Sequence, residues 1–274
     1  MKKISKIITV LVFIFLYIPI LVLAVGSFNT GSDLAVFEGF TLNNYAELFK
    51  DRDLLRLLLN SLIIAVLSSL ISTVLGTAAA VGIHSMKGRM RRVFISVTQI
   101  PMVNPEIVTG VALALLFAFV GSFLKVNSIL GFWTLLIAHI TFNLPYVILN
   151  VMPRFSLMDP YLEEAAMDLG CSPAGAFFKV TLPEILPGVI SGAIMAFTMS
   201  LDDFVISYFV SGSSFVTLPV EIYNYTKKPI PNKVYALFTL MFMVILLLMV
   251  LMNLLQARDQ SRQKKGKLKR KAAL

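Results

Sequence analysis

Residues 159–184 read DPYLEEAAMDLGCSPAGAFFKVTLPE, a stretch that lies between two long apolar runs and has helix signals of its own. Asp159 is suited to cap a helix N-terminus, and Pro160 suits the first helical position. Glu163 and Glu164 then fall in the first turn, where the helix dipole favours negative charge. The first half of the stretch therefore predicts a short helix.

The second half of the stretch predicts a turn and another helix. Gly170 stands where the first helix would end, because glycine readily takes the left-handed conformation found at helix C-termini. Ser172 and Pro173 begin a second helix that runs to about Val180, before Leu182–Pro183. We expect a compact two-helix hook, called here the coupling loop and bounded by residues 153–184.

The chain around this loop has the composition of a membrane protein. Of its 274 residues, 57% are hydrophobic and 14% are charged, whereas soluble domains carry about 25% charged residues. A membrane-spanning helix needs about 20 mainly apolar residues. Six stretches meet this requirement: 7–28, 60–84, 98–120, 128–152, 185–209 and 234–256. We predict an all-α polytopic membrane protein that forms a single transmembrane domain over residues 1–274.

Two details of these spans follow from the same sequence. The first stretch is interpreted as an uncleaved span, because its apolar run is longer than the core of a signal peptide. Pro101 and Pro105 are expected to break or kink the start of the third span, because proline removes a backbone donor and clashes with the preceding turn.

Basic residues predict how the chain is oriented. All 24 lysines and arginines lie outside the six stretches, and 17 of them share the side of both termini and the coupling loop. Cytoplasmic loops are enriched in Lys and Arg. We therefore expect both termini in the cytoplasm. The basic tail, 257–274, is expected to contact anionic lipid headgroups rather than nucleic acid.

Residue counts exclude several kinds of site. The single cysteine, Cys171, leaves no disulfide framework and no multi-thiolate metal site. The two histidines, His84 and His139, leave little for metal or acid–base chemistry, and His139 is interpreted as a satisfied histidine of the bundle. No G-x-x-x-x-G-K-[ST] loop is present to hold the phosphates of ATP. We expect a chain that is not an enzyme and binds no cofactor or metal itself.

The coupling loop contains a spaced motif: Glu164-Ala165-Ala166, three residues, Gly170, nine residues, Val180, one residue and Leu182-Pro183. It resembles the EAA motif of ABC-importer permeases, whose consensus has isoleucine at the position of Val180. The resemblance implies the MetI-like fold, with six spans and a cytoplasmic coupling helix that docks on a nucleotide-binding ATPase. The residues that it assigns to ATPase coupling are Glu163, Glu164, Ala165, Ala166, Asp168, Gly170, Leu182 and Pro183.

Three acidic residues fall inside the predicted spans: Glu106, Asp202 and Asp203. An ionised group at the bilayer centre costs about 2.5–3.5 kcal/mol on insertion scales, so each should face a cavity or a partner. A negatively lined route would suit a cationic substrate. Structural alternatives stay open, because the aspartates can sit in the membrane interface and Glu106 can be satisfied at a helix N-terminus.

The fifth stretch carries a small and polar stripe. Its members recur at three- and four-residue spacing: Gly192, Ala196, Ser200, Asp203 and Ser207. Such a stripe is typical of a helix face that lines a passage or meets a second subunit. The candidate residues of a translocation path are Asn104, Glu106, Ser200, Asp202, Asp203, Ser207 and Tyr208.

Short strings point to the substrate. Residues 104–108 (NPEIV), 200–206 (SLDDFVI) and 217–220 (TLPV) resemble the spermidine/putrescine permeases of the family. The resemblance implies a polyamine importer with an ATPase dimer that uses ATP and Mg²⁺ (PotA-like), a second permease (PotB-like) and an extracellular polyamine-binding protein (PotD-like). Residues 225–235 depart from the expected pattern with three lysines, so the receptor contact stays open.

Two alternative functions stay open. The same kind of importer could carry another solute, such as iron or an aminophosphonate. A secondary carrier or channel could also work alone, although such a protein needs no cytoplasmic docking loop and often shows an inverted repeat.

Overall fold

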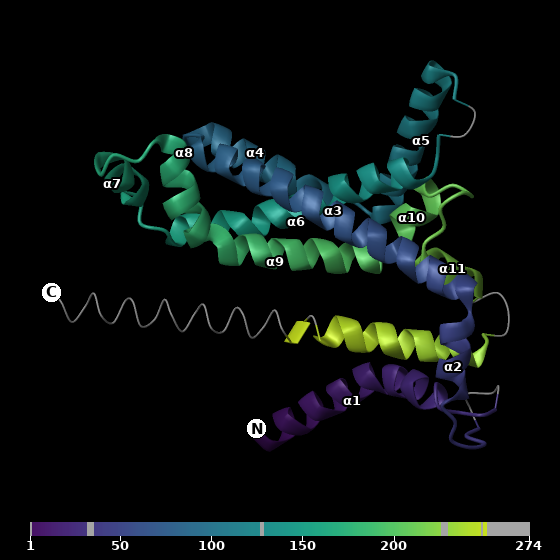
Figure 1. The fold of residues 1–274 in the computed structure, drawn as a ribbon. Helices are drawn as coiled ribbons and strands as arrows, with labels where there is room; N and C mark the ends of the chain where they lie inside the picture. The colour runs from purple at the N-terminus through teal and green to yellow at the C-terminus, as the bar shows by residue number, and fades with distance from the viewer. Residues whose placement is uncertain (1, 32–35, 127–128, 226–229, 248, 251–274) are drawn as a thin grey trace. The chain divides into compact units, whose positions relative to one another are not determined.

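The structure is a computed structural model that describes residues 2–31, 36–126, 129–225, 230–247 and 249–250. Helices dominate these residues (Figure 1). They are α1 (Lys2–Gly26), α2 (Asn43–Lys50), α3 (Arg52–Ser85), α4 (Gly88–Val103), α5 (Glu106–Leu124), α6 (Phe132–Leu157), α7 (Leu162–Asp168), α8 (Pro173–Ala176), the π-helical turn η1 (Phe177–Thr181), α9 (Leu182–Leu201), α10 (Val205–Val210) and α11 (Leu218–Tyr225), followed by an unlabelled helix, Asn232–Leu247.

Five described helices are long and apolar enough to cross a membrane: Lys6–Gly26, Arg52–Ser85, Glu106–Leu124, Phe132–Leu157 and Pro173–Leu201. The prediction of a polytopic all-α membrane protein is confirmed at this level. The sixth predicted span, 234–256, coincides with the shorter helix Asn232–Leu247 and then leaves the described residues. The count of six spans therefore stays a prediction, and the basic tail, 257–274, lies outside the described residues.

Two of the predicted spans are interrupted. The third, 98–120, runs across a break between α4 and α5 at Asn104–Pro105, where proline at the N-cap of α5 ends the regular backbone. The fifth, 185–209, was predicted as one helix, and this is wrong: α9 ends at Leu201 and α10 begins at Val205. These two helix breaks organise the candidate site.

The chain packs as two compact units. One unit joins the N-terminal segment up to Leu58 to the segment that begins at Glu221, and the other is built from residues 59–220. In the first unit, the Asn44 side chain donates to the carbonyls of Ser27 and Asn29, both at 2.9 Å. Lys233 and Asp51 form an ion pair there, with Nζ 2.6 Å from Oδ2.

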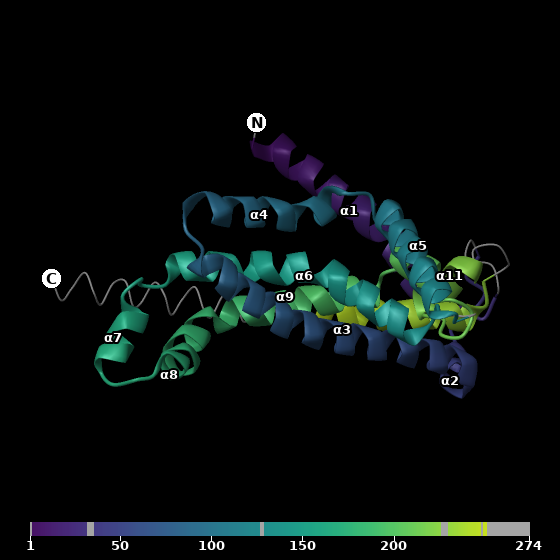
Figure 2. The ribbon, with the colours of Figure 1, turned by 90° about the horizontal axis from the view of Figure 1, so that it is seen from above.

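The second unit contains the coupling loop and both helix breaks. Its α6 and α9 lie side by side (Figures 1 and 2). Glycines allow this approach: a Cβ on Gly188 would lie 2.8 Å from the Asn150 carbonyl oxygen, and one on Gly192 would lie 3.1 Å from the Cα of Val147. Small residues at such contacts are what membrane helices need to pack closely.

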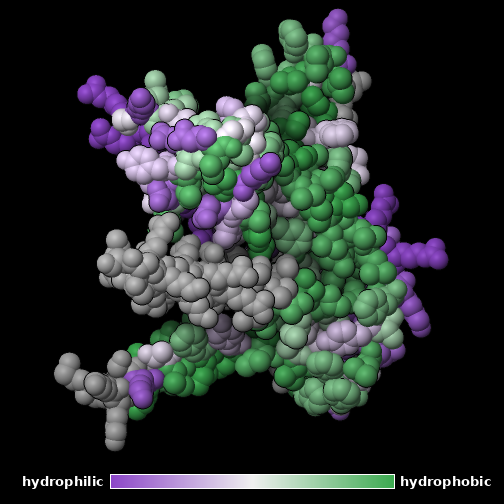
Figure 3. All heavy atoms as spheres, turned by 60° about the vertical axis from the view of Figure 1, so that its left-hand side comes forward, coloured by the Kyte–Doolittle hydropathy of each residue, from purple (hydrophilic) through white to green (hydrophobic). Residues whose placement is uncertain are grey.

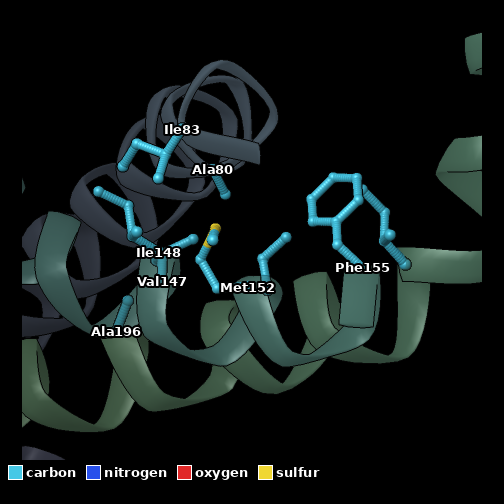
Figure 4. Packing of buried hydrophobic residues seen from close by; sticks show 9 residues of the cluster. Ala80, Ile83, Val147, Ile148, Met152, Phe155 and Ala196 are labelled. Carbon is cyan, nitrogen blue, oxygen red and sulfur yellow. The ribbon is translucent and has the colours of Figure 1, made fainter. Parts of the chain in front are cut away.

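Apolar side chains fill the space where α3, α6 and α9 meet. Ala80 and Ile83 of α3 face Val147, Met152 and Phe155 of α6, all of them buried (Figure 4). Within a bilayer such close packing, rather than transfer out of water, is a main source of helix association. Most of the surface in view in Figure 3 is apolar, with hydrophilic side chains gathered in separate patches.

Candidate functional site

The first helix of the coupling loop begins later than the sequence indicated. Asp159 does not cap it: its Oδ1 accepts a hydrogen bond from the Tyr161 amide at 3.1 Å, in a turn before α7. α7 begins at Leu162, and Glu163 and Glu164 stand in its first turn, as predicted. Asp159 therefore stabilises the turn that precedes α7 and does not cap the helix.

The reversal after α7 agrees with the sequence. Gly170 has a φ of 88°, in the left-handed region that favours glycine. Ser172 caps α8, with its Oγ accepting from the Gly175 amide at 3.1 Å and Pro173 next to it. The second helix does not stop near Val180, however, because η1 carries it directly into α9. A π-helical turn adds a residue to the helix without ending it, and the coupling loop is thereby joined rigidly to a span.

The predicted coupling residues divide by exposure. Glu164, Ala165, Asp168, Gly170 and Pro183 are exposed, Glu163 and Leu182 are partly buried, and Ala166 is buried. Thr181 Oγ1 donates to Glu163 Oε2 at 3.5 Å, so Glu163 faces the inside of the hook. Leu169, which no sequence pattern singled out, is 88% exposed beside Gly170. The exposed residues of α7 thus offer two carboxylates, Glu164 and Asp168, next to small and apolar groups.

The predicted path residues also divide into two sets. Asn104, Glu106, Asp202 and Tyr208 are exposed. The first three lie at or next to the helix breaks, and Tyr208 lies within α10. Glu106 begins α5 directly after one break, and Asp202 follows the last residue of α9 at the other. The two breaks adjoin because α5 packs on α10, where a Cβ on Gly110 would lie 3.0 Å from the Phe209 ring.

Helix termini of both polarities lie at this site. α4 ends at Val103 and α9 ends at Leu201, so the C-terminal ends of both helices lie at the breaks. The last carbonyl groups of a helix lack intrahelical partners and carry the negative end of the helix dipole. The N-termini of α5 and α10 lie at the same breaks and carry the positive end of the dipole. The negative charge that suits a cation therefore comes from the two exposed carboxylates, Glu106 and Asp202.

Asp203 differs from its neighbour Asp202. It is 8% exposed, and its Oδ1 accepts from the Ile206 amide at 3.2 Å. Its Oδ2 accepts from the Ser207 amide and hydroxyl, both at 2.8 Å, and lies 3.4 Å from His139 Nε2. Asp203 therefore caps α10 within the helix packing.

The stripe on the fifth stretch faces inward. Gly192, Ala196, Ser200, Asp203 and Ser207 are all buried. Ser200 Oγ lies 2.8 Å from Ser68 Oγ of α3 and is hydrogen-bonded to His139 Nδ1 of α6. Within this chain the stripe packs against α3 and α6. The expectation that it lines a passage or meets a second subunit stays a prediction. The interpretation of His139 as a satisfied bundle histidine is confirmed.

The break after Leu201 was missed, although one signal for it exists. Aspartate favours helix N-termini, and Asp203 accepts from amides three and four residues ahead. The partners of His139 were not predictable in this way, because Ser200 and Ser207 lie 61 and 68 residues away along the chain.

Known proteins share this sequence and this architecture. Residues 72–264, which are more than half of the chain, match the family described as "Binding-protein-dependent transport system inner membrane component". The chain belongs to this family. It is accordingly the multi-pass inner-membrane permease subunit of an ABC importer, and ATP is used by a partner ATPase.

Relatives within the family match almost from end to end. The chain is 38% identical over 248 residues to the spermidine/putrescine transport system permease protein PotC of Haemophilus influenzae, covering 90% of this chain and 94% of that protein. It is 38% identical over 236 residues to the putrescine transport system permease protein PotI of Escherichia coli K12, covering 85% and 84%.

Two solved structures have a similar fold. One is a bacterial ABC transporter involved in the import of the acidic polysaccharide alginate, with a TM-score of 0.70, 12% identity, and coverage of 94% of this chain and 95% of that one. The other is the inward-facing MetNI methionine ABC transporter, with a TM-score of 0.56, 18% identity, and coverage of 77% and 95%. At these identities the likeness concerns the fold alone.

Proposed function

We propose that this permease carries polyamines, with spermidine and putrescine as substrates, through a route that passes the two helix breaks. The observation that carries this proposal is that two exposed carboxylates, Glu106 and Asp202, stand at the two helix breaks, beside the C-termini of α4 and α9. Relatives named for spermidine and putrescine transport support the same substrate class.

The chemistry of the exposed set fits an aliphatic polyamine. Carboxylates accept charge-assisted hydrogen bonds from ammonium groups, which are about twice as strong as neutral ones. Tyr208 is 48% exposed and can offer a ring face to a cation. The methylene chain between ammonium groups would meet apolar side chains of α5, such as Ile107 and Val108. Broken helices whose C-terminal ends hold cations are a recurrent device of membrane transporters.

The coupling loop is proposed to dock on the ATPase through the exposed face of α7. Glu164 would supply the charge, Ala165 would let the partner surface approach, and the turn at Gly170 would give the hook its shape. Closure of the ATPase dimer would then move α9 through η1, because no loop intervenes between hook and span. Outward and inward access would alternate as the binding protein delivers substrate at the outer face.

The arrangement in the membrane belongs to the same proposal. The helix Asn232–Leu247 would complete a sixth span with residues beyond the described part, in one transmembrane domain. Both termini and the coupling loop would lie in the cytoplasm, as the excess of basic residues on that side indicates. A PotB-like permease, a PotA-like ATPase dimer and a PotD-like binding protein would complete the importer.

Uptake of labelled spermidine and putrescine at low external concentration tests the substrate. Cells with and without the gene are compared in a background that lacks other polyamine importers. Loss of energy-dependent uptake on deletion, restored by the gene, is expected. Unchanged uptake would overturn the polyamine proposal, and other cations, including iron, would then be screened with the same strains.

A further inference from the structure

We propose that His139 is a positioning residue for transport: it holds both sides of the α9–α10 break and thereby fixes where the Asp202 carboxylate lies. This inference rests on the proposed function, in which Asp202 contacts the cationic substrate. His139 itself is 1% exposed and cannot meet the substrate. Its role would be exerted through the backbone of residues 200–204.

The imidazole ring bridges two helices that the break separates. Nδ1 is hydrogen-bonded to the hydroxyl of Ser200, in the last turn of α9. Nε2 lies 3.1 Å from Ser207 Oγ of α10 and 3.4 Å from Asp203 Oδ2, the carboxylate that caps α10. Asp202 stands between these two anchors and has its amide bonded to the Thr198 carbonyl at 3.4 Å. Its backbone is therefore held from both ends, while its side chain points out to the exposed face.

A buried chain of hydrogen bonds steadies the histidine in turn. The Asn143 amide donates to Ser68 Oγ at 3.4 Å, and Ser68 Oγ lies 2.8 Å from Ser200 Oγ. Ser200 can donate to Nδ1 of the ring. The Ser68 hydroxyl, which also lies 3.4 Å from the Ala65 carbonyl oxygen, can donate to Ser200 at the shorter distance. Nε2–H then points toward Asp203 and Ser207. In this orientation the ring N–H and the Ser207 hydroxyl both donate toward the Asp203 carboxylate. A buried carboxylate needs such donors because its charge must be compensated.

No proline or glycine lies between Leu201 and Val205 to impose the break, so the backbone there depends on these side-chain contacts. Asp203 replaces the missing helical partners of the Ile206 and Ser207 amides. Without the histidine, Asp203 would lose its contact with α6 and Ser200 would lose its bond across the break. The two helix ends would then shift, and the Asp202 carboxylate would move with them.

The experiment uses the complete importer in proteoliposomes and measures spermidine taken up per ATP hydrolysed. Asp202→Asn is expected to lower this ratio about tenfold, the size of one lost charge-assisted hydrogen bond. His139→Leu is expected to lower it by a similar factor. His139→Gln, which keeps an amide donor near the position of Nε2, should restore most of the ratio.

The double variant decides whether His139 acts through Asp202. If it does, Asp202→Asn with His139→Leu lowers the ratio no further than either change alone, because coupled residues are not additive. Thr134→Val is the control: it removes another buried α6–α10 hydrogen bond, 3.0 Å to the Val210 carbonyl, together with the Thr134–Gly131 bonds at the start of α6, away from the break. It should reduce stability while leaving the ratio unchanged.

The possible failures are distinguishable. If the effects of Asp202→Asn and His139→Leu multiply, or if Thr134→Val lowers the ratio as much as His139→Leu, the positioning role is overturned and the path proposal stands. If Asp202→Asn alone leaves the ratio unchanged, the path through Asp202 is overturned as well. Should His139→Leu fail to assemble, Ser200→Ala, which removes only the α9 side of the bridge, replaces it in the same cycle.

Discussion

The coupling loop and the α9–α10 break are both irregular segments, but nearby residues predict the structure of the first better than that of the second. In the loop, the turn at Gly170 and the cap at Ser172 stand where nearby residues predicted them. At the break, Asp202 is exposed and Asp203 is buried, and this division depends on His139 from a distant part of the chain. Turns and caps follow from local chemistry, whereas burial of an acid depends on tertiary packing.

The largest effect is expected in the coupling loop. Glu164→Lys should abolish uptake while the protein is still made and inserted, because reversing a charge at an interface costs about 2–5 kcal/mol. Labelled-spermidine uptake and co-purification of the ATPase measure this. Glu184→Lys, an exposed acid at the start of α9, is the control and should retain uptake. Uptake that survives Glu164→Lys would contradict the docking role of α7.

The next effect separates the two aspartates. Asp203→Leu should lower the stability of the purified complex by about 2–4 kcal/mol. It removes the acceptor of two buried amide groups and the carboxylate that faces His139. Asp202→Leu should change stability by less than about 0.5 kcal/mol, as expected for an exposed position. Thermal unfolding in detergent compares the two variants. Equal losses of stability would show that the two side chains are not divided as the structure has them.

A smaller effect on stability is expected for the Lys233–Asp51 ion pair, whose partners are also far apart in the sequence but are partly exposed to solvent. The Lys233 ammonium, hydrogen-bonded to Asp51, holds the pKa of Asp51 below its usual value. A lowered folded-state pKa gives stability that is present above the unfolded pKa and is lost as pH falls through the folded one. Asp51→Asn should therefore cost about 0.5 kcal/mol at neutral pH.

The same variant should show no difference from the parent protein once the pH lies below the pKa of Asp51 in the folded state. Unfolding temperatures at several pH values, measured side by side for the two proteins, test this. A difference that persists in acid would mean that Asp51 acts through packing rather than through its charge.

Much of the fold was predictable because membrane spans and basic loops have strong sequence patterns. Five predicted spans correspond to described helices long enough to cross the bilayer, and Pro105 marked the α4–α5 break in advance. The start of α7 was misplaced because Asp159 can form a turn as well as a cap. The α9–α10 break was missed because no proline or glycine marks it and only Asp203 signals it.

The residues of the candidate site could be predicted from the sequence, but which of them are exposed and which pack against another helix could not. Helical spacing grouped Asp203 with Ser200 and Ser207 on one face, and the structure confirms that they share surroundings. Spacing alone cannot say whether such a face meets another helix or a passage. The close packing of α9 on α6, through Gly188 and Gly192, decides that it meets a helix.

Thiol labelling at the two adjacent aspartates tests the central claim most directly. Cys171 is the single cysteine, so Cys171→Ser gives a background into which Asp202→Cys or Asp203→Cys is placed, within the assembled importer in membrane vesicles. A cationic methanethiosulfonate reagent is expected to modify position 202 during ATP turnover and not position 203, and spermidine should slow the reaction at 202. Equal modification of both positions, or no protection by spermidine, would contradict the account.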